Sequence, residues 1–299
     1  MKKMRVLLGL ITRDNGYQCN QASAAQMEAR QLGVELDVVW AEGDAIVQSQ
    51  QLIDAIQSDA SRKPHGILFD PVNESGLPQV ARAAVAAGIA LGVIDLFPPY
   101  VVDLRRSPSA VVFSIGSDQT EVGRIQGQQL AKLFSKGGTA LLIMGPGTNL
   151  TARQRMTGLN QTKPSGFNFR QLRGNWSRES GHAAVKTYLR LDTARARDID
   201  CVVAQSDDMA MGARQAFEQL TDPIEKHAWL SLPFLGCDGD PATGQTWAQE
   251  GKLKATVAIP ANAPLGLRML IEALKDKKRP VEYCLTVPQS FPPLKSLAG

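Results

Sequence analysis

The chain has 299 residues, of which 43% are hydrophobic and 21% are charged, and its formal net charge at pH 7 is +4. This composition is typical of a globular protein, and the length predicts two domains that each bury their own core. Lysines and arginines are scattered, apart from the run 275–279, where cations suit the end of a predicted helix. The charge pattern therefore argues against nucleic acid as a partner.

The four cysteines (Cys19, Cys201, Cys237 and Cys284) lack the spacing of a CxxC or Cys/His metal site. We expect neither a disulfide nor a metal site. No apolar run approaches the ~18 residues of a membrane span.

The N-terminal residues superficially resemble a signal peptide. The apolar stretch 6–11 is short, however, and leads into Arg13 and Asp14 without a small-residue cleavage site. We therefore interpret it as the first strand. The sequence leaves open whether an exported protein has lost its leader or the protein is cytoplasmic.

Strands and helices alternate along the first part of the chain. Helices show apolar residues at a 3.6-residue period, and buried parallel strands show short apolar runs. The expected order is strand 6–12, helix 21–32, strand 35–40, helix 46–57, strand 66–70, helix 77–87, strand 89–95 and strand 111–115. This alternation predicts a parallel sheet with helices on both faces.

The same alternation restarts after residue 115. Asp118 is predicted to cap the next helix, with Glu121 completing a variant of the capping box. The expected elements are helix 119–134, strand 140–144, helix 151–160, strand 167–172, helix 179–190, strand 201–205, helix 209–220, strand 233–237, helix 244–250, strand 255–259, helix 264–275 and strand 281–287. Two similar α/β cores are thus predicted.

Polar residues follow several of these strands directly. They lie at 13–17, at 95, in the loop that leads to 153–155, at 206–208 and at 238–239. In open α/β sheets, ligands bind beyond the carboxyl ends of the strands. The pattern predicts one pocket for a small polar molecule, assembled from distant parts of the chain.

Several longer segments carry a family resemblance. They are 25–33, 115–118 with Gly123 and Gly127, 151–155 with Gly158, AQSDDMAMGA at 204–213, 236–239 and 252–256. Together they resemble type I periplasmic sugar-binding proteins, the ribose-binding group in particular, and the related ligand-binding cores of lactose-repressor-type regulators. The matching segments extend over nearly the whole chain, and 204–213 is the most specific.

The resemblance implies an α/β fold of two Rossmann-like lobes, each a mostly parallel sheet flanked by helices. Three hinge crossings, expected near Ser117, Pro260 and Val281, would join the lobes and let them close on a ligand. The N-terminal lobe is expected to comprise residues 1–116 and 261–280. The C-terminal lobe is expected to comprise residues 117–260 and 281–299.

The resemblance also implies ligand-binding residues. A sugar needs planar side chains against its C–H faces and charged groups for its hydroxyls, since charge-assisted hydrogen bonds are the stronger ones. Tyr17 and Trp176 match ring-stacking aromatics, with ordinary packing as the alternative. Asp95 and Asp238 match hydroxyl-binding carboxylates. Arg155 matches the family's ligand-binding arginine, with surface solvation as the alternative.

Three further candidates are uncharged. Asn15 matches a ligand-contacting Asn, although Asn-Gly is also a turn signal. Ser206 stands where the family commonly has Asn. Asn262 is expected to substitute for a ligand Gln whose position Ile259 occupies. Asp207 is instead expected to cap the following helix.

The residue after Asp95 is often Arg in the family, but here it is Leu96, followed by further apolar residues at 97–100. Together with Ile259, this predicts a less polar pocket than that for ribose. The ligand is expected to be a larger or partly apolar sugar-like molecule.

An enzyme is the first alternative. No GxGxxG or GxSxG motif occurs, and none of the three histidines lies at a predicted strand end. Asp95 and Asp238 could act as an acid–base pair, but binding needs the same residues. We therefore predict a non-enzymatic protein with no catalytic residues and no cofactor.

The sequence is thus interpreted as a solute-binding protein that delivers a sugar to an ABC transporter permease. We expect a monomer in the periplasm or another extracytoplasmic compartment. A cytoplasmic location is the alternative that the sequence leaves open. The alternative is a ligand-sensing domain that reports sugar to a membrane receptor, kinase or transcriptional partner. A repressor would need a DNA-binding headpiece before the first strand, and that strand already begins near residue 5.

Overall fold

The computed structural model describes residues 3–297. The chain forms two compact units. Unit 1 extends to Ser117 and also takes in Pro260–Thr286, while unit 2 covers Asp118–Ile259 and continues from Val287. The chain therefore passes between the units after Ser117, before Pro260 and after Thr286.

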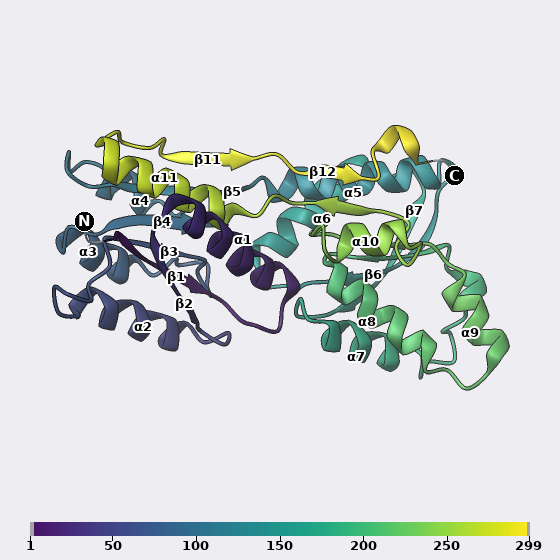
Figure 1. Cartoon of the computed structure of the whole chain (residues 1–299). Helices are drawn as coiled ribbons and strands as arrows, with labels where there is room; N and C mark the ends of the chain where they lie inside the picture. The colour runs from purple at the N-terminus through teal and green to yellow at the C-terminus, as the bar shows by residue number, and fades with distance from the viewer. Residues whose placement is uncertain (1–2, 298–299) are drawn as a thin grey trace. The chain divides into compact units, whose positions relative to one another are not determined.

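Unit 1 contains a parallel sheet with the strand order β11-β5-β4-β3-β1-β2 (Figure 1). Its strands are β1 (Arg5–Leu10), β2 (Glu35–Trp40), β3 (Gly66–Phe69), β4 (Ala90–Ile94), β5 (Val112–Ser117) and β11 (Tyr283–Thr286). Its helices are α1 (Gly16–Leu32), α2 (Ala45–Gln57), α3 (Pro78–Ala86), α4 (Tyr100–Leu104) and α11 (Asn262–Asp276). Apolar residues of α1 and α11 pack in one core cluster, and those of α2, α3 and α4 pack in another. Helices thus cover both faces of the sheet, as the alternation predicted.

Unit 2 contains a smaller parallel sheet, β7-β6-β8-β9, and an antiparallel pair, β10-β12. The strands are β6 (Gly138–Met144), β7 (Phe167–Arg173), β8 (Cys201–Ala204), β9 (Phe234–Leu235), β10 (Thr256–Ala258) and β12 (Gln289–Phe291). The helices are α5 (Gln119–Leu133), α6 (Leu150–Thr162), α7 (Arg178–Tyr188), α8 (Asp207–Glu218), α9 (Pro223–Leu230) and α10 (Gly244–Gln249). Its core again forms two clusters, one including α7 and α8 and the other including α5 and α6.

Helices α5 and α6 approach one another at glycines. A Cβ atom on Gly123 would lie 1.9 Å from the carbonyl oxygen of Arg155, and one on Gly158 would lie 1.8 Å from that of Thr120. Such distances exclude any larger residue at these two positions unless the helices move apart. The position of α6, which carries Arg155, therefore depends on direct backbone contact with α5.

The cap predicted at the start of α5 is confirmed, because the Asp118 side chain accepts hydrogen bonds from the backbone N–H groups of Thr120 and Glu121. Short elements without a clear period, such as α4, α9 and β12, were not predicted.

The domain assignment of residues 281–286 differs from the prediction, which gave 281–299 to the second lobe. Strand β11 pairs with β5 in the register Tyr283↔Ser114 to Thr286↔Ser117, which makes it part of unit 1. An apolar run predicts that a strand forms but does not specify which sheet it joins. The third passage between units therefore follows this strand.

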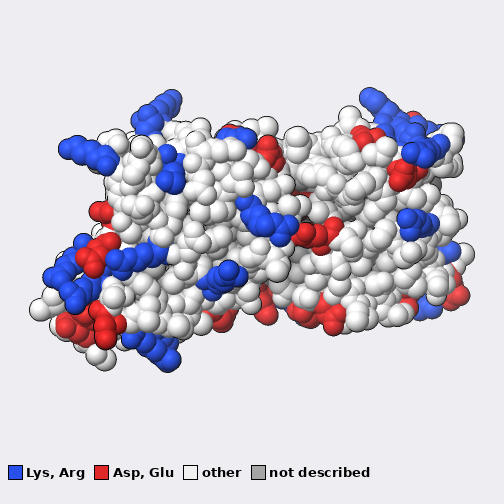
Figure 2. All heavy atoms as spheres, turned by 180° about the vertical axis from the view of Figure 1, so that it is seen from behind, with Lys and Arg blue, Asp and Glu red and all other residues white. Residues whose placement is uncertain are grey.

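Charged side chains of both signs are interspersed on the face shown in Figure 2. Within residues 3–297, no helix combines the length and apolar character needed to cross a bilayer.

Candidate functional site

In unit 1, the carboxylate of Asp95 receives hydrogen bonds from three side chains. The Tyr17 hydroxyl donates to its Oδ2 atom at 2.8 Å, and the Asn262 amide donates to Oδ1 at 2.6 Å. Gln21 donates to Oδ2 at a longer 3.4 Å. Asp95 follows β4, Tyr17 and Gln21 lie on α1, and Asn262 begins α11. The fold thus collects one polar cluster from three separate segments, and we call it cluster 1.

Asn15 lies at the start of α1, beside cluster 1 in the chain. It is the N-cap of this helix, and its side chain accepts a hydrogen bond from the Gln18 N–H at 3.1 Å. Because the cap lies here, α1 begins at Gly16, earlier than the predicted residue 21. Tyr17 is consequently a residue of the first helical turn and not of a loop.

Asp70 is a buried carboxyl group in unit 1 that the sequence analysis did not select. It accepts a hydrogen bond from the Gln18 amide at 2.6 Å. Burial raises the pKa of Asp70 well above its ordinary value, the nearby charge of Asp95 raises it further, and the Gln18 hydrogen bond opposes both. Asp70 directly follows β3, so the strand-end pattern that selected Asp95 could also have found it.

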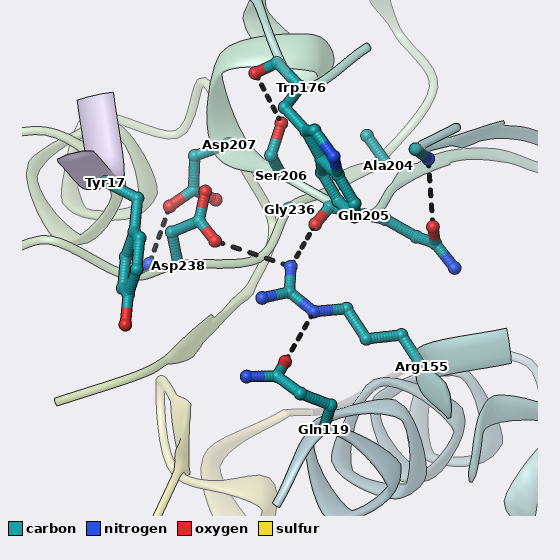
Figure 3. Close-up of polar contacts among 12 residues, drawn as sticks. Tyr17, Gln119, Arg155, Trp176, Ala204, Gln205, Ser206, Asp207, Gly236 and Asp238 are labelled. Atoms are coloured by element: carbon teal, nitrogen blue, oxygen red, sulfur yellow. Dashed lines mark hydrogen bonds and ion pairs between the residues drawn. The ribbon is translucent and has the colours of Figure 1, made fainter. Parts of the chain in front are cut away.

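In unit 2, the guanidinium of Arg155 is 5% exposed and is held on several sides (Figure 3). Its Nε donates to Gln119 Oε1 at 2.9 Å, and a terminal nitrogen donates to the backbone carbonyl of Gln205 and to Asp238 Oδ1 at 3.4 Å. The guanidinium carbon also lies 5.4 Å from the centre of the Trp176 ring. A buried charge needs such partners. We call Arg155, Trp176, Ser206 and Asp238 cluster 2.

Asp238 follows β9 and forms an ion pair with Arg155. Burial raises the pKa of Asp238 to about 7, even though Arg155 acts to lower it; Asp208 also raises it. The charge and hydrogen bond of Arg155 and a backbone hydrogen bond lower the pKa, but the loss of water around the buried carboxylate outweighs them. This carboxyl group therefore changes its charge close to neutral pH.

Trp176 lies between β7 and α7 and is half-buried. A Cβ atom on Gly145 would lie 2.2 Å from its ring, so the indole rests directly on the backbone that follows β6. Gly145 thus makes room for the indole ring, and the guanidinium of Arg155 lies over that ring.

The start of α8 differs from the prediction. The N-cap is Ser206, whose hydroxyl oxygen accepts from the Met209 N–H at 3.1 Å and whose hydroxyl donates to the Trp176 carbonyl at 3.4 Å. The prediction that Asp207 caps this helix is wrong, because the helix begins one residue earlier than a cap at Asp207 would allow.

Asp207 points inward instead of capping. Its carboxylate accepts from the Gly239 N–H and from the Thr256 hydroxyl, both at 2.7 Å. Burial and the charge of Asp238 raise its pKa well above the ordinary value. Asp207 therefore fixes the loop that carries Asp238.

Three candidates have a left-handed backbone: Asp95 (φ 56°), Trp176 (φ 77°) and Asp238 (φ 110°). In the described part of the chain, the other non-glycine residues with positive φ are Glu42, Leu77 and Lys277. Each such residue costs about 1–3 kcal/mol, and such strain is common at functional sites. Three of these six residues are thus candidates, which supports their selection independently of their side-chain chemistry.

Comparison with known proteins identifies the family. A family model described as the periplasmic binding protein domain matches residues 8–278. The chain belongs to the periplasmic binding protein family. It is 25% identical over 285 residues to the ribose import binding protein of Salmonella typhimurium, covering 95% of this chain and 89% of that one. It is 27% identical to the putative rhizopine-binding protein of Rhizobium meliloti, over 62% of this chain and 58% of that one.

Solved structures show the same fold. The periplasmic solute-binding protein of an Actinobacillus succinogenes ABC transporter, bound to D-allose, matches with a TM-score of 0.80 at 18% identity, over 96% of this chain and 97% of that one. The binding protein of the Shewanella sp. ANA-3 arabinose ABC transporter, bound to L-arabinofuranose, also gives 0.80, at 20% identity over 98% and 94%. The predicted fold class is confirmed. The prediction of a non-enzymatic binding protein agrees with the periplasmic binding protein domain model and with the import binding proteins that the chain resembles.

Within this periplasmic binding protein, the candidates divide between the units. Unit 1 holds Asn15, Tyr17, Asp95 and Asn262, and unit 2 holds Arg155, Trp176, Ser206 and Asp238. Across residues 3–297, no group of three or more His, Cys, Asp or Glu side chains is arranged to hold a metal ion.

The apolar residues after Asp95 pack against unit 1 itself. The Leu96 side chain would lie 3.0 Å from a Cβ atom on Gly76, and the ring of Phe97 meets that of Tyr283 edge-on at 5.7 Å. Ile259, which stands where a ligand Gln was expected, is 4% exposed.

Proposed function

We propose that the protein captures a sugar or sugar-like polyol and delivers it to the permease of an ABC transporter. The observation that carries this proposal is that each unit presents an aspartate and an aromatic side chain beyond the carboxyl ends of its own parallel strands. The comparisons support a sugar as the ligand, since one relative is named for ribose and similar structures hold allose or arabinofuranose.

The proposed contacts follow from the chemistry of a sugar. Asp95 and Asp238 accept hydrogen bonds from ring hydroxyls, and Arg155 donates to ring or hydroxyl oxygens. Tyr17 and Trp176 cover the apolar C–H faces of the ring. The proposed ligand residues are Asn15, Tyr17, Asp95, Arg155, Trp176, Ser206 and Asp238, with Asn262 supporting Asp95.

In the proposed mechanism, one ligand contacts cluster 1 and cluster 2 together. Such a ligand favours the closed arrangement of the two units, whereas a ligand that gained nothing from closure would not shift the equilibrium. The permease then recognises the closed, loaded form. We further propose that the protein works as a monomer. We also place it outside the cytoplasm, since an import receptor meets its ligand there.

The sugar itself is proposed to differ from ribose. Leu96 stands where the ribose-binding group often has Arg, and Ile259 stands where Gln is frequent, so two polar ligand contacts are missing. A larger or less polar ring compensates for this loss through apolar contact.

Thermal unfolding against a sugar panel tests the proposal. D-ribose, D-allose, L-arabinose, myo-inositol and several disaccharides are added at about 1 mM. A ligand with a micromolar Kd stabilises the fold by roughly 4 kcal/mol at that concentration, which raises Tm by several degrees. A panel without any shift contradicts a sugar ligand.

A second experiment measures the binding of Asp238→Ala to the sugar that gives the largest shift in Tm. Because hydrogen bonds to a charged group contribute roughly 1.5–3 kcal/mol each, we expect the affinity to fall by one to three orders of magnitude. An unchanged binding isotherm would remove Asp238 from the site.

A further inference from the structure

The three places where the chain leaves or enters unit 1 are joined by side-chain hydrogen bonds. Ser117 is the last residue before the first passage, Asn262 follows the second closely, and Thr286 is the last residue before the third. The Ser117 and Thr286 hydroxyls lie 2.7 Å apart, and the Thr286 hydroxyl donates to Asn262 Oδ1 at 2.8 Å. These residues lie far apart in the sequence but form one connected group within unit 1.

The direction of each hydrogen bond in this group can be assigned. Asn262 Oδ1 can only accept, so the single proton of the Thr286 hydroxyl is directed to it. A second acceptor, the Gly116 carbonyl, lies farther away at 3.3 Å. The Ser117 hydroxyl must therefore be the donor to Thr286.

The same chain of hydrogen bonds ends at Asp95. The Asn262 amide nitrogen donates to Asp95 Oδ1 at 2.6 Å. An amide turned the other way would place its oxygen against a carboxylate oxygen, so Asp95 and Thr286 together fix its orientation. Donors and acceptors thus run in one direction from Ser117 through Thr286 and Asn262 to Asp95, an arrangement in which each bond strengthens the next.

Asn262 is poorly placed to contact a ligand directly. It is fully buried, and both ends of its amide are engaged within unit 1. Its partner Asp95, in contrast, is half-buried and is the group proposed to meet the ligand. Asn262 thus contacts the ligand-facing candidate Asp95 through its own hydrogen bond.

We propose that Asn262 and Thr286 are positioning residues that couple Asp95 to the three passages between the units. This inference rests on the proposed function in taking Asp95 as the ligand-binding carboxylate. A ligand that engages Asp95 changes the hydrogen bond to Asn262, and the change reaches Thr286 and Ser117. Because hinge motions concentrate in a few residues at such passages, the network ties ligand contact to the opening and closing of the protein.

Hydrogen–deuterium exchange of the ligand-free protein tests the network. Thr286→Val removes the hydroxyl and keeps the shape, Thr286→Ser keeps the hydroxyl, and Thr139→Val is a matched strand substitution in unit 2. We expect Thr286→Val to accelerate exchange about three- to tenfold in peptides that cover residues 114–119 and 259–264, as the loss of one or two hydrogen bonds would. Thr286→Ser and Thr139→Val should exchange like the wild type. Acceleration confined to the peptide around residue 286 would overturn the proposal.

A double-mutant cycle of Asp95→Asn with Thr286→Val tests the coupling itself. In the ligand-free protein, the combined effect on exchange at residues 114–119 should depart at least about twofold from the product of the single effects. Multiplicative effects would mean that the two residues act independently. Since neither experiment needs a sugar, failure of this proposal can be distinguished from failure of the sugar panel.

Discussion

Cluster 1 and cluster 2 each position an aspartate at a strand end, but they do so with different chemistry. Within unit 1, Asp95 accepts hydrogen bonds from neutral donors, namely a phenol and two amides. Asp238 lies beside the buried cation of Arg155. Removing a neutral donor leaves no unpaired cation behind. Removing one partner of a buried ion pair, in contrast, leaves the other charge buried without compensation. The two halves of the candidate site should therefore respond differently to mutation and to pH.

The largest effect is expected for Arg155→Met. This substitution keeps an apolar side chain of similar length but leaves Asp238 buried without its cation and Gln119 without its donor. Breaking one partner of a buried pair costs about 3–5 kcal/mol. We expect a lower Tm and a more than hundredfold loss of affinity, measured by calorimetric titration with the sugar identified in the panel. The control is Arg153→Met on the same helix, which removes an exposed arginine and should bind nearly as well as the wild type. Equal effects of the two substitutions would contradict the assignment of Arg155.

The pH dependence is expected to separate the clusters. The pKa of Asp238 is raised to about 7 in the folded protein, from an ordinary value of 3.8, so the folded state binds the proton more tightly than the unfolded chain. The stabilisation that proton binding by Asp238 gives to the folded state is complete below about pH 4. This stabilisation is lost as the pH rises towards 7. The Tm of the wild type should therefore rise between pH 7.5 and pH 5.5, and Asp238→Asn should reduce this rise. Asp95→Asn serves as the comparison in cluster 1. An identical slope in Asp238→Asn and the wild type would show that this group does not titrate in that range.

The smallest effect is expected for Tyr17→Phe. The substitution removes one donor to Asp95 but keeps the aromatic ring, so stability should fall by only about 0.5–1.5 kcal/mol. If the ring is the part that meets the sugar, affinity should fall less than tenfold in Tyr17→Phe and considerably more in Tyr17→Ala. Titration of both variants decides between these roles, and equal losses would show that the hydroxyl is the important group.

Much of the fold could be predicted because parallel strands and amphipathic helices leave local patterns in the sequence. The assignment of β11 could not, since an apolar strand suits either sheet and only its pairing with β5 decides. The error at Asp207 has a similar origin. Ser206 and Asp207 are both good caps, and the choice depends on where Gly239 and Thr256 lie in space.

The candidate site shows the same division. Residues at strand ends, such as Asp95 and Asp238, could be selected from the sequence with help from the resemblance, and their role in binding stays a prediction. The orientation of Asn262 could not be foreseen, because it follows from contacts with residues far away in the sequence. Hydrogen bonds across such separations depend on the finished tertiary structure.

The left-handed backbone at Asp95, Trp176 and Asp238 has a consequence for redesign of the ligand preference. These loops hold their shape against an intrinsic conformational bias, so β-branched or bulky replacements there would first disturb the loop and only then the chemistry. Residues in ordinary backbone regions, such as Tyr17 in the first turn of α1, carry no such restriction. A library that varies the second group and keeps the first should yield folded proteins with altered ligands far more often than one that varies both.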